Sequence, residues 1–586
     1  MLAPWPVALP LVAAAFLAGL GDKLPRRLAD AIAIGAAAIT ALCCALLLAG
    51  PPVVYWFGGI QPRQGVALGI DFAIDANGAG LAVLSSLLIL AALFFSLKYF
   101  DKPAHMFQVL LLVFLAGLCG FSLTGDLFDL FVFFEVMSAA AFGLCAYKSR
   151  EVGPLQGAIN FAVTNTAGAF ITLSGIALLY SRTGALNLSH MHRMIAGNDD
   201  SLVLAAAALV CTGFLVKAAI VPFQFWLADA HAAAPTPACI VFSGAMVEAG
   251  LYAVARLQGA LFGLPQLRTP LLAAGVATCL VGAVMCFAQR HLKRLLAFST
   301  IAHAGVILCG IAVLEPGGLS GAGLYVVGHG LVKAALFLCA GMLLHRLQSI
   351  DELALHGRGR EVPWVGVLFA LGGLLLAGAP PTAMFFGDGA IHHALEAHPI
   401  ARFAVTVASI ATGAAVLRAC GRIFLGLGPR EPDAPGGGEQ DEEPETEAAP
   451  IPWSMWVPAA FLLALAIGSA WLPREHAGSA AARMLDAHSW ATQVLDRAQP
   501  AMSSPPPEEP LAKGLAHAAL TVGLAIALAL LTLFRKRLPE ILRGPVRAVW
   551  NPLAGSLRAL HTGAVGDQVA WLTLGVAALG ASLVFS

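Results

Sequence analysis

The sequence has few charged residues, and its positive and negative charges balance. Only 12% of the 586 residues are Asp, Glu, Lys or Arg, whereas soluble domains carry roughly 25%. The formal net charge is zero, which argues against a nucleic-acid partner. In place of charge, 59% of the residues are hydrophobic and the mean hydropathy is +0.80. This composition is typical of a protein that lives in a lipid bilayer.

The cysteines form no pattern that holds a metal or a redox centre. Most of the 11 cysteines lie inside apolar segments, as Cys211 and Cys339 do, and none belongs to a CxxC pair. The adjacent Cys43 and Cys44 lack the spacing of iron–sulfur ligands. We therefore expect no cofactor and no redox centre in this chain, and no enzyme activity of the chain alone. Membership of a larger complex with redox activity stays open.

Apolar stretches of about 20 residues recur along nearly the whole chain, which predicts an all-α, polytopic membrane protein. Bounded by Gly, Pro or charge, they number about sixteen. The predicted spans are 5–20, 29–50, 79–97, 105–123, 127–147, 157–180, 202–227, 237–262, 270–288, 295–314, 320–345, 363–393, 401–427, 453–472, 514–534 and 566–586. The first has no basic leader, so we expect a retained helix and not a signal peptide.

Lys and Arg gather in the loops that follow odd-numbered spans. Basic residues follow the first, third, fifth, ninth and fifteenth spans, whereas only Arg63 lies between the second and third. By the positive-inside rule, both termini are predicted on the outer side of the cell (inner) membrane.

Two polar segments interrupt the apolar pattern in the C-terminal part. Residues 428–452 form an acidic linker rich in Pro and Gly, which predicts a disordered loop. Residues 535–561 space arginines among Leu, Val and Trp. This second segment is predicted to be an amphipathic helix on the inner membrane surface or against a partner subunit. An ordinary basic loop would also account for its composition.

Charged residues occur inside the predicted spans, where they are costly. Glu135 lies in the middle of 127–147 and Lys217 in the middle of 202–227. A charge at the centre of a membrane helix costs about 3 kcal/mol or more, so such residues usually mark an ion path. The pattern recurs at Glu248, Lys333 and Asp388. The series predicts a protein that moves protons or cations through a membrane.

Prolines interrupt two of the spans that carry these charges. Pro222 follows Lys217 by five residues, and Pro380-Pro381 precedes Asp388 by seven. Proline removes a backbone donor, and broken membrane helices are tolerated where the freed groups line a polar cavity. A simple kink is the alternative for Pro222 alone, but the lysine beside it favours a functional break.

His329 and Lys333 lie four residues apart and share one helix face. A lone histidine in a membrane helix is often a packing residue. Two titratable groups at this spacing indicate a relay, because each changes the proton affinity of the other.

Five long motifs, in this order, resemble one family: the antiporter-like subunits of respiratory complex I, Mrp-type cation/proton antiporters and membrane-bound hydrogenases. The motifs are FEVMSAAAFGLCAY around Glu135, KAAIVPFQFWLADAHAAAPTP from Lys217, AQRHLKRLLAFSTIAHAG (288–305), HGLVKAALFLCAG (329–341) and LAGAPPTAMFFGD (376–388). The resemblance covers residues 70–427. It implies a fourteen-helix core with two inverted five-helix repeats.

The same resemblance divides the chain and assigns roles. The expected parts are N-terminal helices 1–104, a first repeat 105–262, a second repeat 270–427, the linker 428–452 and C-terminal helices 453–586. Glu135 corresponds to the glutamate that pairs with Lys217, which sets the protonation state of that lysine. Lys333 corresponds to the central lysine of the second repeat, with His329 one turn before it.

Two positions depart from the commonest pattern of the family. Glu248 and Asp388 stand where many members have lysine. A carboxylate still carries a proton, so transport is compatible with both. Whether Glu248 neutralises Lys217 or Lys333, or contacts another subunit, stays open.

Three functions remain open from the sequence. The first is an ion-translocating subunit of a hydrogenase-like or complex I-like assembly. The second is a subunit of an Mrp-type antiporter that exchanges Na⁺ or K⁺ for protons. The third is a stand-alone transporter or a subunit of an inorganic-carbon uptake system. In the first two, the partners are other membrane subunits, the lipid bilayer and the transported ions.

Overall fold

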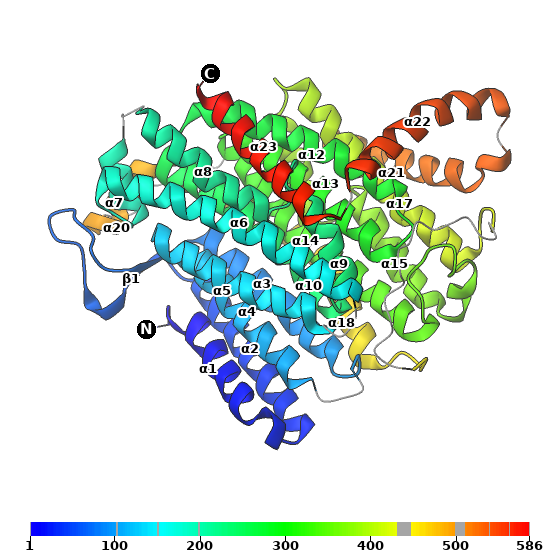
Figure 1. Cartoon of the computed structure of the whole chain (residues 1–586), viewed down its shortest axis with the longest axis horizontal. Helices are drawn as coiled ribbons and strands as arrows, with labels where there is room; N and C mark the ends of the chain where they lie inside the picture. The colour runs from blue at the N-terminus through cyan, green and yellow to red at the C-terminus, as the bar shows by residue number, and fades with distance from the viewer. Residues whose placement is uncertain are drawn as a thin grey trace.

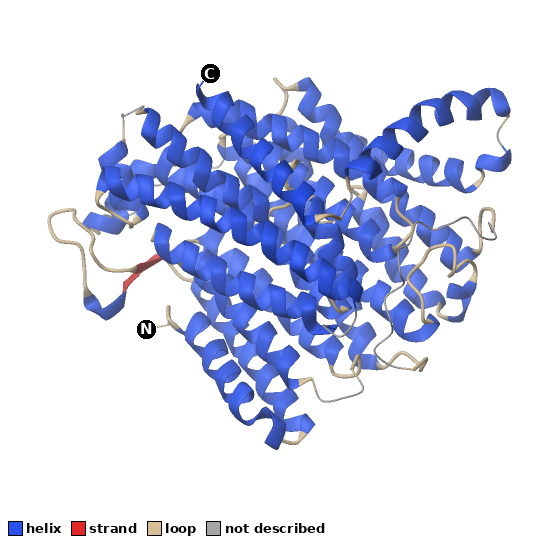
Figure 2. Ribbon diagram, in the orientation of Figure 1, coloured by secondary structure: helices blue, strands red, loops and turns tan. Residues whose placement is uncertain are grey.

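The computed structural model describes residues 2–100, 104–148, 152–196, 200–430, 447–497, 510–537, 539–561 and 563–584. Helices make up nearly all of the described chain (Figures 1 and 2). The central part of the predicted acidic linker, residues 431–446, lies outside the described residues.

The helices of the N-terminal half include six of 16 residues or more at its start and mostly shorter ones after them. They are α1 (Trp5–Leu20), α2 (Arg26–Ala49), α3 (Ala76–Ser96), α4 (His105–Leu123), α5 (Leu127–Cys145), α6 (Val152–Thr183), α7 (Leu188–Ile195), α8 (Ser201–Lys217), α9 (Phe225–Ala233), α10 (Thr236–Val241) and α11 (Val247–Leu257). A π-helical turn, Phe242–Met246, joins α10 to α11.

The remaining helices continue the same architecture. They are α12 (Arg268–Ala288), α13 (Leu292–Ala312), α14 (Pro316–Leu347), α15 (Pro363–Leu376), α16 (Ala383–Ala394), α17 (Pro399–Leu425), α18 (Trp453–Gly468), α19 (Arg474–Leu485), α20 (Ala487–Asp496), α21 (Leu511–Leu533), α22 (Glu540–Leu560) and α23 (Val565–Val584). Helices α13 and α14 are almost wholly buried and form the centre of the bundle.

Thirteen helices of the described residues are long and apolar enough to cross a membrane, or fourteen if one bent pair is a single span. The predicted count of sixteen is therefore not confirmed as sixteen continuous helices. Two predicted spans, 202–227 and 363–393, are each divided into two shorter helices. The last one, 566–586, is α23, which meets α22 at a bend of 100°.

The two divided spans confirm the predicted helix breaks. The first break runs from Ala218 to Gln224 between α8 and α9, and the second from Ala377 to Thr382 between α15 and α16. Positive φ angles at Ala219 (52°) and Gly378 (96°) turn the chain out of each helix. Proline interrupts the helix at each break because it has no N–H to donate.

Several surface elements between the spans had no signal in the sequence analysis. A short antiparallel hairpin pairs β1 (Val53–Trp56) with β2 (Asp71–Ile74), so that Val53 lies opposite Ile74. Helices α7 and α20 pack together, and both lie near β1 at the left edge of Figure 1. These elements are short and only partly apolar, so a pattern of membrane-length apolar runs does not predict them.

The C-terminal helices return along the outside of the bundle. Helix α21 packs on α17, and α23 lies along α6 and α8 of the N-terminal half. Between them, the predicted basic amphipathic segment forms α22, which projects at the upper right of Figure 1. Trp550 packs edge-on against Phe287, and Arg558 donates to the carbonyl of Ala288 at 2.6 Å. The segment is thus a helix fixed to the end of α12.

Candidate functional site

Lys217, the last residue of α8, is completely buried. Its Nζ donates to Ser138 Oγ at 2.6 Å and lies 4.4 Å from the ring centre of Phe134. Both residues belong to α5. A buried ammonium needs such partners, because leaving a charge unpaired in a low dielectric is costly. The first predicted site lysine is therefore held by a hydroxyl and an aromatic face.

Glu135 lies on the same helix as Ser138 and is half-buried. The resemblance predicts that it pairs with Lys217, yet the described residues hold no hydrogen bond or ion pair between the two. One carboxylate oxygen, Oε1, is buried without a hydrogen-bond partner. Ser138, three residues further along α5, takes the lysine instead. Glu135 and Lys217 thus lie near enough to interact electrostatically but form no direct contact.

The first helix break finds partners for its freed backbone groups. The indole Nε1 of Trp226 donates to the carbonyl of Val216 at 2.9 Å, and the amide of Val221 donates to Thr278 Oγ1 at 3.0 Å. Trp226 also stacks on Phe161 at 4.5 Å. Non-helical backbone at membrane depth persists only when its polar groups are satisfied in this way.

Glu248 has its partner inside this chain. Its Oε1 lies 2.8 Å from His329 Nδ1, and both side chains are completely buried. The sequence left open whether Glu248 faces Lys217, Lys333 or another subunit, and the structure selects His329. The contact joins α11 of the N-terminal half to α14 of the C-terminal half.

A close approach of two backbones makes the Glu248–His329 contact possible. A Cβ atom on Gly330 would lie 2.7 Å from the carbonyl oxygen of Gly244, so these helices can meet only where Gly330 has no side chain. Gly244 lies in the π-helical turn that precedes α11. Such turns often occur at functional sites, since the extra residue redirects the side chains that follow.

Lys333 is also completely buried, near the middle of α14. Its Nζ donates to Ser299 Oγ and to the carbonyl of Leu296, both on α13. The ring of Phe337, one turn further, lies 5.4 Å from the ammonium. His231 of α9 stacks on that ring at 4.7 Å, and neither of its nitrogens has a hydrogen-bond partner in the described chain. His231 therefore lies inside the protein.

His303 is another buried histidine that the sequence analysis did not identify, and it lies next to His329. His303 of α13 bonds through Nδ1 to Tyr325 Oη at 2.7 Å and through Nε2 to Thr412 Oγ1 at 2.9 Å. Its ring centre lies 5.1 Å from that of His329. His303 lies in an apolar run of the motif at 288–305. A histidine in such a run was the signal that could have identified it as a buried titratable group.

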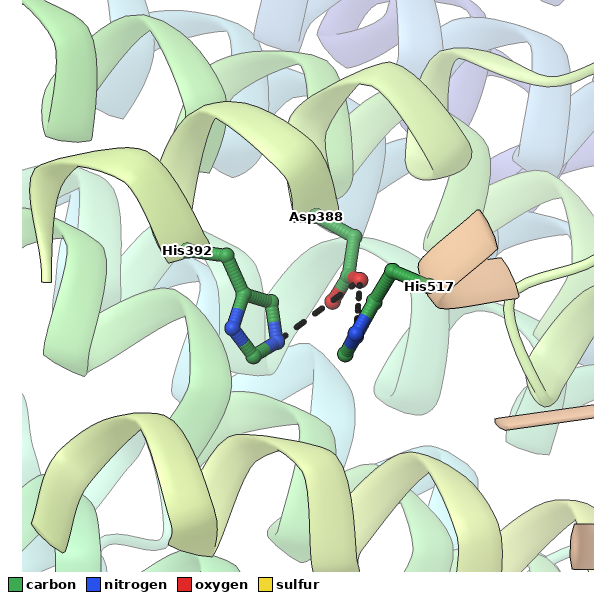
Figure 3. Close-up of side chains that lie close together, drawn as sticks. All are labelled: Asp388, His392 and His517. Atoms are coloured by element: carbon green, nitrogen blue, oxygen red, sulfur yellow. Dashed lines mark ion pairs between the residues drawn. The ribbon is translucent and has the colours of Figure 1, made fainter. Parts of the chain in front are cut away.

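Asp388 lies in α16 and is 8% exposed. Its Oδ2 is 3.8 Å from His392 Nε2 and 3.5 Å from His517 Nε2 (Figure 3). His517 comes from α21, more than a hundred residues later in the chain. Nothing in the sequence connects α21 with α16, so only the packing of the C-terminal helices reveals this neighbour.

The second helix break is capped much as the first is. Thr382 Oγ1 accepts from the amide of Phe385 at 3.0 Å and begins α16, while the amide of Ala383 donates to Ser469 Oγ at 2.9 Å. Side-chain hydroxyls at such positions satisfy the first free amides of a helix. The short helix that carries Asp388 is thereby fixed at its start.

A cavity of about 580 Å³ reaches one of these buried groups. Its lining includes Gly50 and His476, which are exposed, and Glu248, which is 1% exposed. The walls come from the ends of several helices, among them α2, α3, α13, α14 and α19. The cavity connects the surface of the protein with Glu248.

These features define a class of protein: a multi-pass membrane protein with buried titratable side chains from several helices and two broken spans. The comparisons with known proteins specify the family. Residues 124–412 match the model of the transmembrane family "NADH:quinone oxidoreductase/Mrp antiporter". The chain belongs to this family, and it is an antiporter-like subunit of the complex I and Mrp type.

Two curated relatives illustrate the two branches of the family. The N-type subunit of the NADH-quinone oxidoreductase of Desulforudis audaxviator is 33% identical over 371 residues, which cover 61% of this chain and 72% of the relative. A D-type subunit of a probable K⁺/H⁺ antiporter of Rhizobium meliloti is 30% identical over 439 residues, 69% of this chain and 80% of the relative.

Solved structures extend the likeness to the fold. A chain of the Mrp complex from a Dietzia species superposes with a TM-score of 0.73 and 27% identity, over 84% of this chain and 99% of the other. A chain of the archaeal membrane-bound sulfane sulfur reductase reaches 0.74 at 24% identity, with the same coverage. At that identity the second match shows the fold alone. Each of these structures is a multisubunit membrane complex.

Proposed function

We propose that this chain moves protons through the membrane along a line of buried titratable groups. The predicted site residues on this line are Glu135, Lys217, Glu248, His329, Lys333 and Asp388. We add His231, His303 and His517, which the structure brings beside them. The transported ion is the proton, and in the Mrp-type alternative Na⁺ or K⁺ is exchanged for it.

One observation carries the proposal: the line crosses the boundary between the two halves of the chain. Glu248 of α11 bonds to His329 of α14, and His231 of α9 stacks against the ring beside Lys333. Ionisable groups buried inside a membrane protein are costly, and they usually mark an ion or proton path. A series that continues through both halves supports transport.

The contacts of Lys217 support a switch. Its ammonium is held by a neutral hydroxyl, and the nearby carboxylate of Glu135 has an unused oxygen. A carboxylate stabilises the charged lysine when the two approach, and separating them in a low dielectric favours release of the proton. Small movements of α5 against α8 would therefore load and unload Lys217.

The cavity supports a route of access to the middle of the line. It begins among helix ends such as Gly50 and reaches Glu248. By the positive-inside rule, the loop between α2 and α3 faces outward. With both termini on the outer side of the cell (inner) membrane, the cavity opens outward, and Glu248 would exchange protons with the outer solution.

We further propose that the chain works with other membrane subunits. Its relatives and structural neighbours are subunits of multisubunit complexes. Exposed apolar residues of the outer helices, such as Leu42 and Phe170, suit contact with lipid or with a neighbouring subunit. Glu248 already has one hydrogen-bond partner within the chain, because its Oε1 contacts His329 Nδ1.

The test is transport by membrane vesicles that contain the chain together with its complex. Lys217→Ala removes the buried ammonium and should abolish proton movement, followed by a pH-sensitive dye, while leaving the amount of assembled complex unchanged. Lys98→Ala is the matched control, because Lys98 is exposed just beyond the end of α3. Full transport by Lys217→Ala would refute the proposed line. Adding Na⁺ or K⁺ gradients to the same vesicles distinguishes proton pumping from cation exchange.

A further inference from the structure

Three side chains with metal-ligating atoms converge where α16 and α21 meet. Asp388, His392 and His517 each offer one ligand atom, and these atoms lie within 4.8 Å of one another. Asp388 and His392 are four residues apart on α16 and so project from one face. His517 approaches from α21, and Figure 3 shows the carboxylate between the two rings.

The three groups do not satisfy one another. Asp388 Oδ1, His392 Nε2 and His517 Nε2 are all buried without a hydrogen-bond partner among the described residues. The nearest separations, 3.5 and 3.8 Å, are too long or too poorly aligned for hydrogen bonds. A buried polar atom without a partner costs about 1–3 kcal/mol. Two such nitrogens, His392 Nε2 and His517 Nε2, both lie beside Asp388 Oδ2 and indicate a missing occupant.

The spacing suits a tetrahedral metal ion. Zinc bonds of about 2.0–2.2 Å to nitrogen and oxygen put neighbouring ligand atoms roughly 3.3–3.6 Å apart. Asp388 Oδ2 lies 3.5 and 3.8 Å from the two Nε2 atoms, and all three ligand atoms lie within 4.8 Å of one another, so the side chains must close in on an ion. The two helices already lie close together, because a Cβ atom on Gly514 of α21 would be 3.3 Å from the ring of Phe385 of α16.

We propose that Asp388, His392 and His517 bind one divalent transition-metal ion of the zinc type. The two Nε2 atoms and the Asp388 carboxylate are the protein ligands, and water completes the tetrahedron. Two imidazoles select such an ion over Mg²⁺ and Ca²⁺, which prefer oxygen ligands. The ion bridges the C-terminal helix α21 and α16.

The surroundings make this an exchangeable ion and not a permanent structural one. Arg402 of α17 interacts electrostatically with both histidines, and its positive charge weakens the binding of a cation. The His517 side chain is 28% exposed. It stands six residues after the start of α21 at Leu511, about 9 Å along the helix. A metal ion therefore reaches the site from the near end of that helix.

The consequence for transport rests on the proposed function. Asp388 is one of the groups that carry the proton, and a bound metal ion occupies its carboxylate and holds His392 and His517 in place. Proton movement then stops at this point. Metal binding itself depends only on the three ligands and is measured separately.

The first experiment measures zinc binding to the purified, metal-stripped full chain by competition with a chromogenic chelator. We expect one Zn²⁺ per chain, and both His392→Asn and His517→Asn should weaken binding by at least about tenfold, or about 1.4 kcal/mol. His393→Asn is the matched control, since His393 is the exposed neighbour and pairs with Glu396. Mg²⁺ should not compete. Equal zinc affinity of His517→Asn and the unaltered chain would overturn the proposal.

A second variant separates ligand loss from misfolding. His517→Cys supplies a thiolate at the same place, so it should still bind metal, with preference shifted from Zn²⁺ toward the softer Cd²⁺. No binding by His517→Cys would count against the site.

In vesicles, Zn²⁺ should inhibit transport by the unaltered chain and leave His517→Asn much less affected. If Lys217→Ala transports normally, the proposed line fails while the binding results still decide the metal site. Binding without inhibition would refute the block at Asp388 alone.

Discussion

The two halves of the molecule hold their central lysines in similar ways but place them differently. Lys217 donates to Ser138 and Lys333 to Ser299, and each ammonium lies near a phenylalanine ring. Lys217, however, is the last residue before a helix break, whereas Lys333 stands near the middle of a continuous helix. The two lysines therefore have similar hydrogen-bond and aromatic partners but stand in different backbone settings.

In the second half, the buried ionisable residue next to the helix break is a carboxylate and not a lysine. Asp388 follows the break between α15 and α16, and His517 of α21 lies beside it. In the first half, Lys217 stands directly before the break. A break frees backbone groups and admits water, so it favours a residue that must change its charge. The difference is that the buried ionisable residue beside the break is a lysine in the first half and an aspartate in the second.

The largest expected effect concerns Lys333. If the halves form one series, Lys333→Ala should reduce proton transport as completely as Lys217→Ala, by at least about 100-fold, since each removes a group that accepts and passes on a proton. The double variant should be no worse than either single one. Transport assays on the three variants in vesicles decide this. Substantial activity of Lys333→Ala beside an inactive Lys217→Ala would mean that the halves conduct separately.

Asp388→Asn should have the next largest effect. The substitution keeps the shape but removes the ionisable group, so transport should fall by roughly tenfold or more, with little change in thermal stability. Both quantities are measured with a chelator present, so that metal binding plays no part. If Asp388→Asn transports normally while Lys333→Ala is inactive, Asp388 is structural and the path leaves the protein elsewhere.

Removing the hydroxyl of Ser138 should slow transport more than removing that of Ser299. Ser138 Oγ is the single hydrogen-bond acceptor of Lys217 in the described chain, whereas Lys333 also donates to the carbonyl of Leu296. Because a hydrogen bond to a charged group contributes about 1.5–3 kcal/mol, Ser138→Ala should slow transport by about tenfold, and Ser299→Ala by less. Equal losses in initial transport rate would contradict the difference between the two lysine sites.

The smallest effect concerns stability at the hairpin end of the first half. Asp71 of β2 is fully buried, and burial, with the charge of Asp126 second, raises its pKa to about 8. The folded protein therefore favours protonated Asp71, and stability falls as the pH rises from about 4, the pKa of an exposed Asp, to 8. Asp71→Asn removes this cost and keeps an acceptor for Asn187, which donates to Oδ1 at 2.8 Å.

The melting temperature of Asp71→Asn, relative to the unaltered chain, should therefore be higher at pH 9 than at pH 5. Asp200→Asn is the control, because that carboxylate is partly exposed and its pKa is lowered by the backbone amide of Leu202, with Arg182 adding to it. A difference for Asp71→Asn that does not grow with pH would contradict a buried, protonated Asp71.

The sequence predicted well whatever depends on local pattern. Apolar runs located thirteen of the membrane-length helices, and prolines beside charged residues located both breaks. Segment 535–561 was predicted to be amphipathic and forms α22. These features follow from lipid requiring apolar surface and satisfied backbone groups within each segment, which neighbouring residues alone determine.

Contacts between distant segments were decided only by the tertiary structure. Glu248 was noticed as a buried charge, but its partner His329 lies 81 residues away on another helix. His517 belongs to an ordinary apolar helix by pattern, and only the packing of α21 against α16 places it beside Asp388. Such pairings depend on how helices cross, and a one-dimensional pattern of hydrophobicity carries no information about that. The sequence by itself determined the helices, their breaks and their costly charges, while the tertiary structure decided which charges meet, because a side chain's partner is set by the helix packed against it.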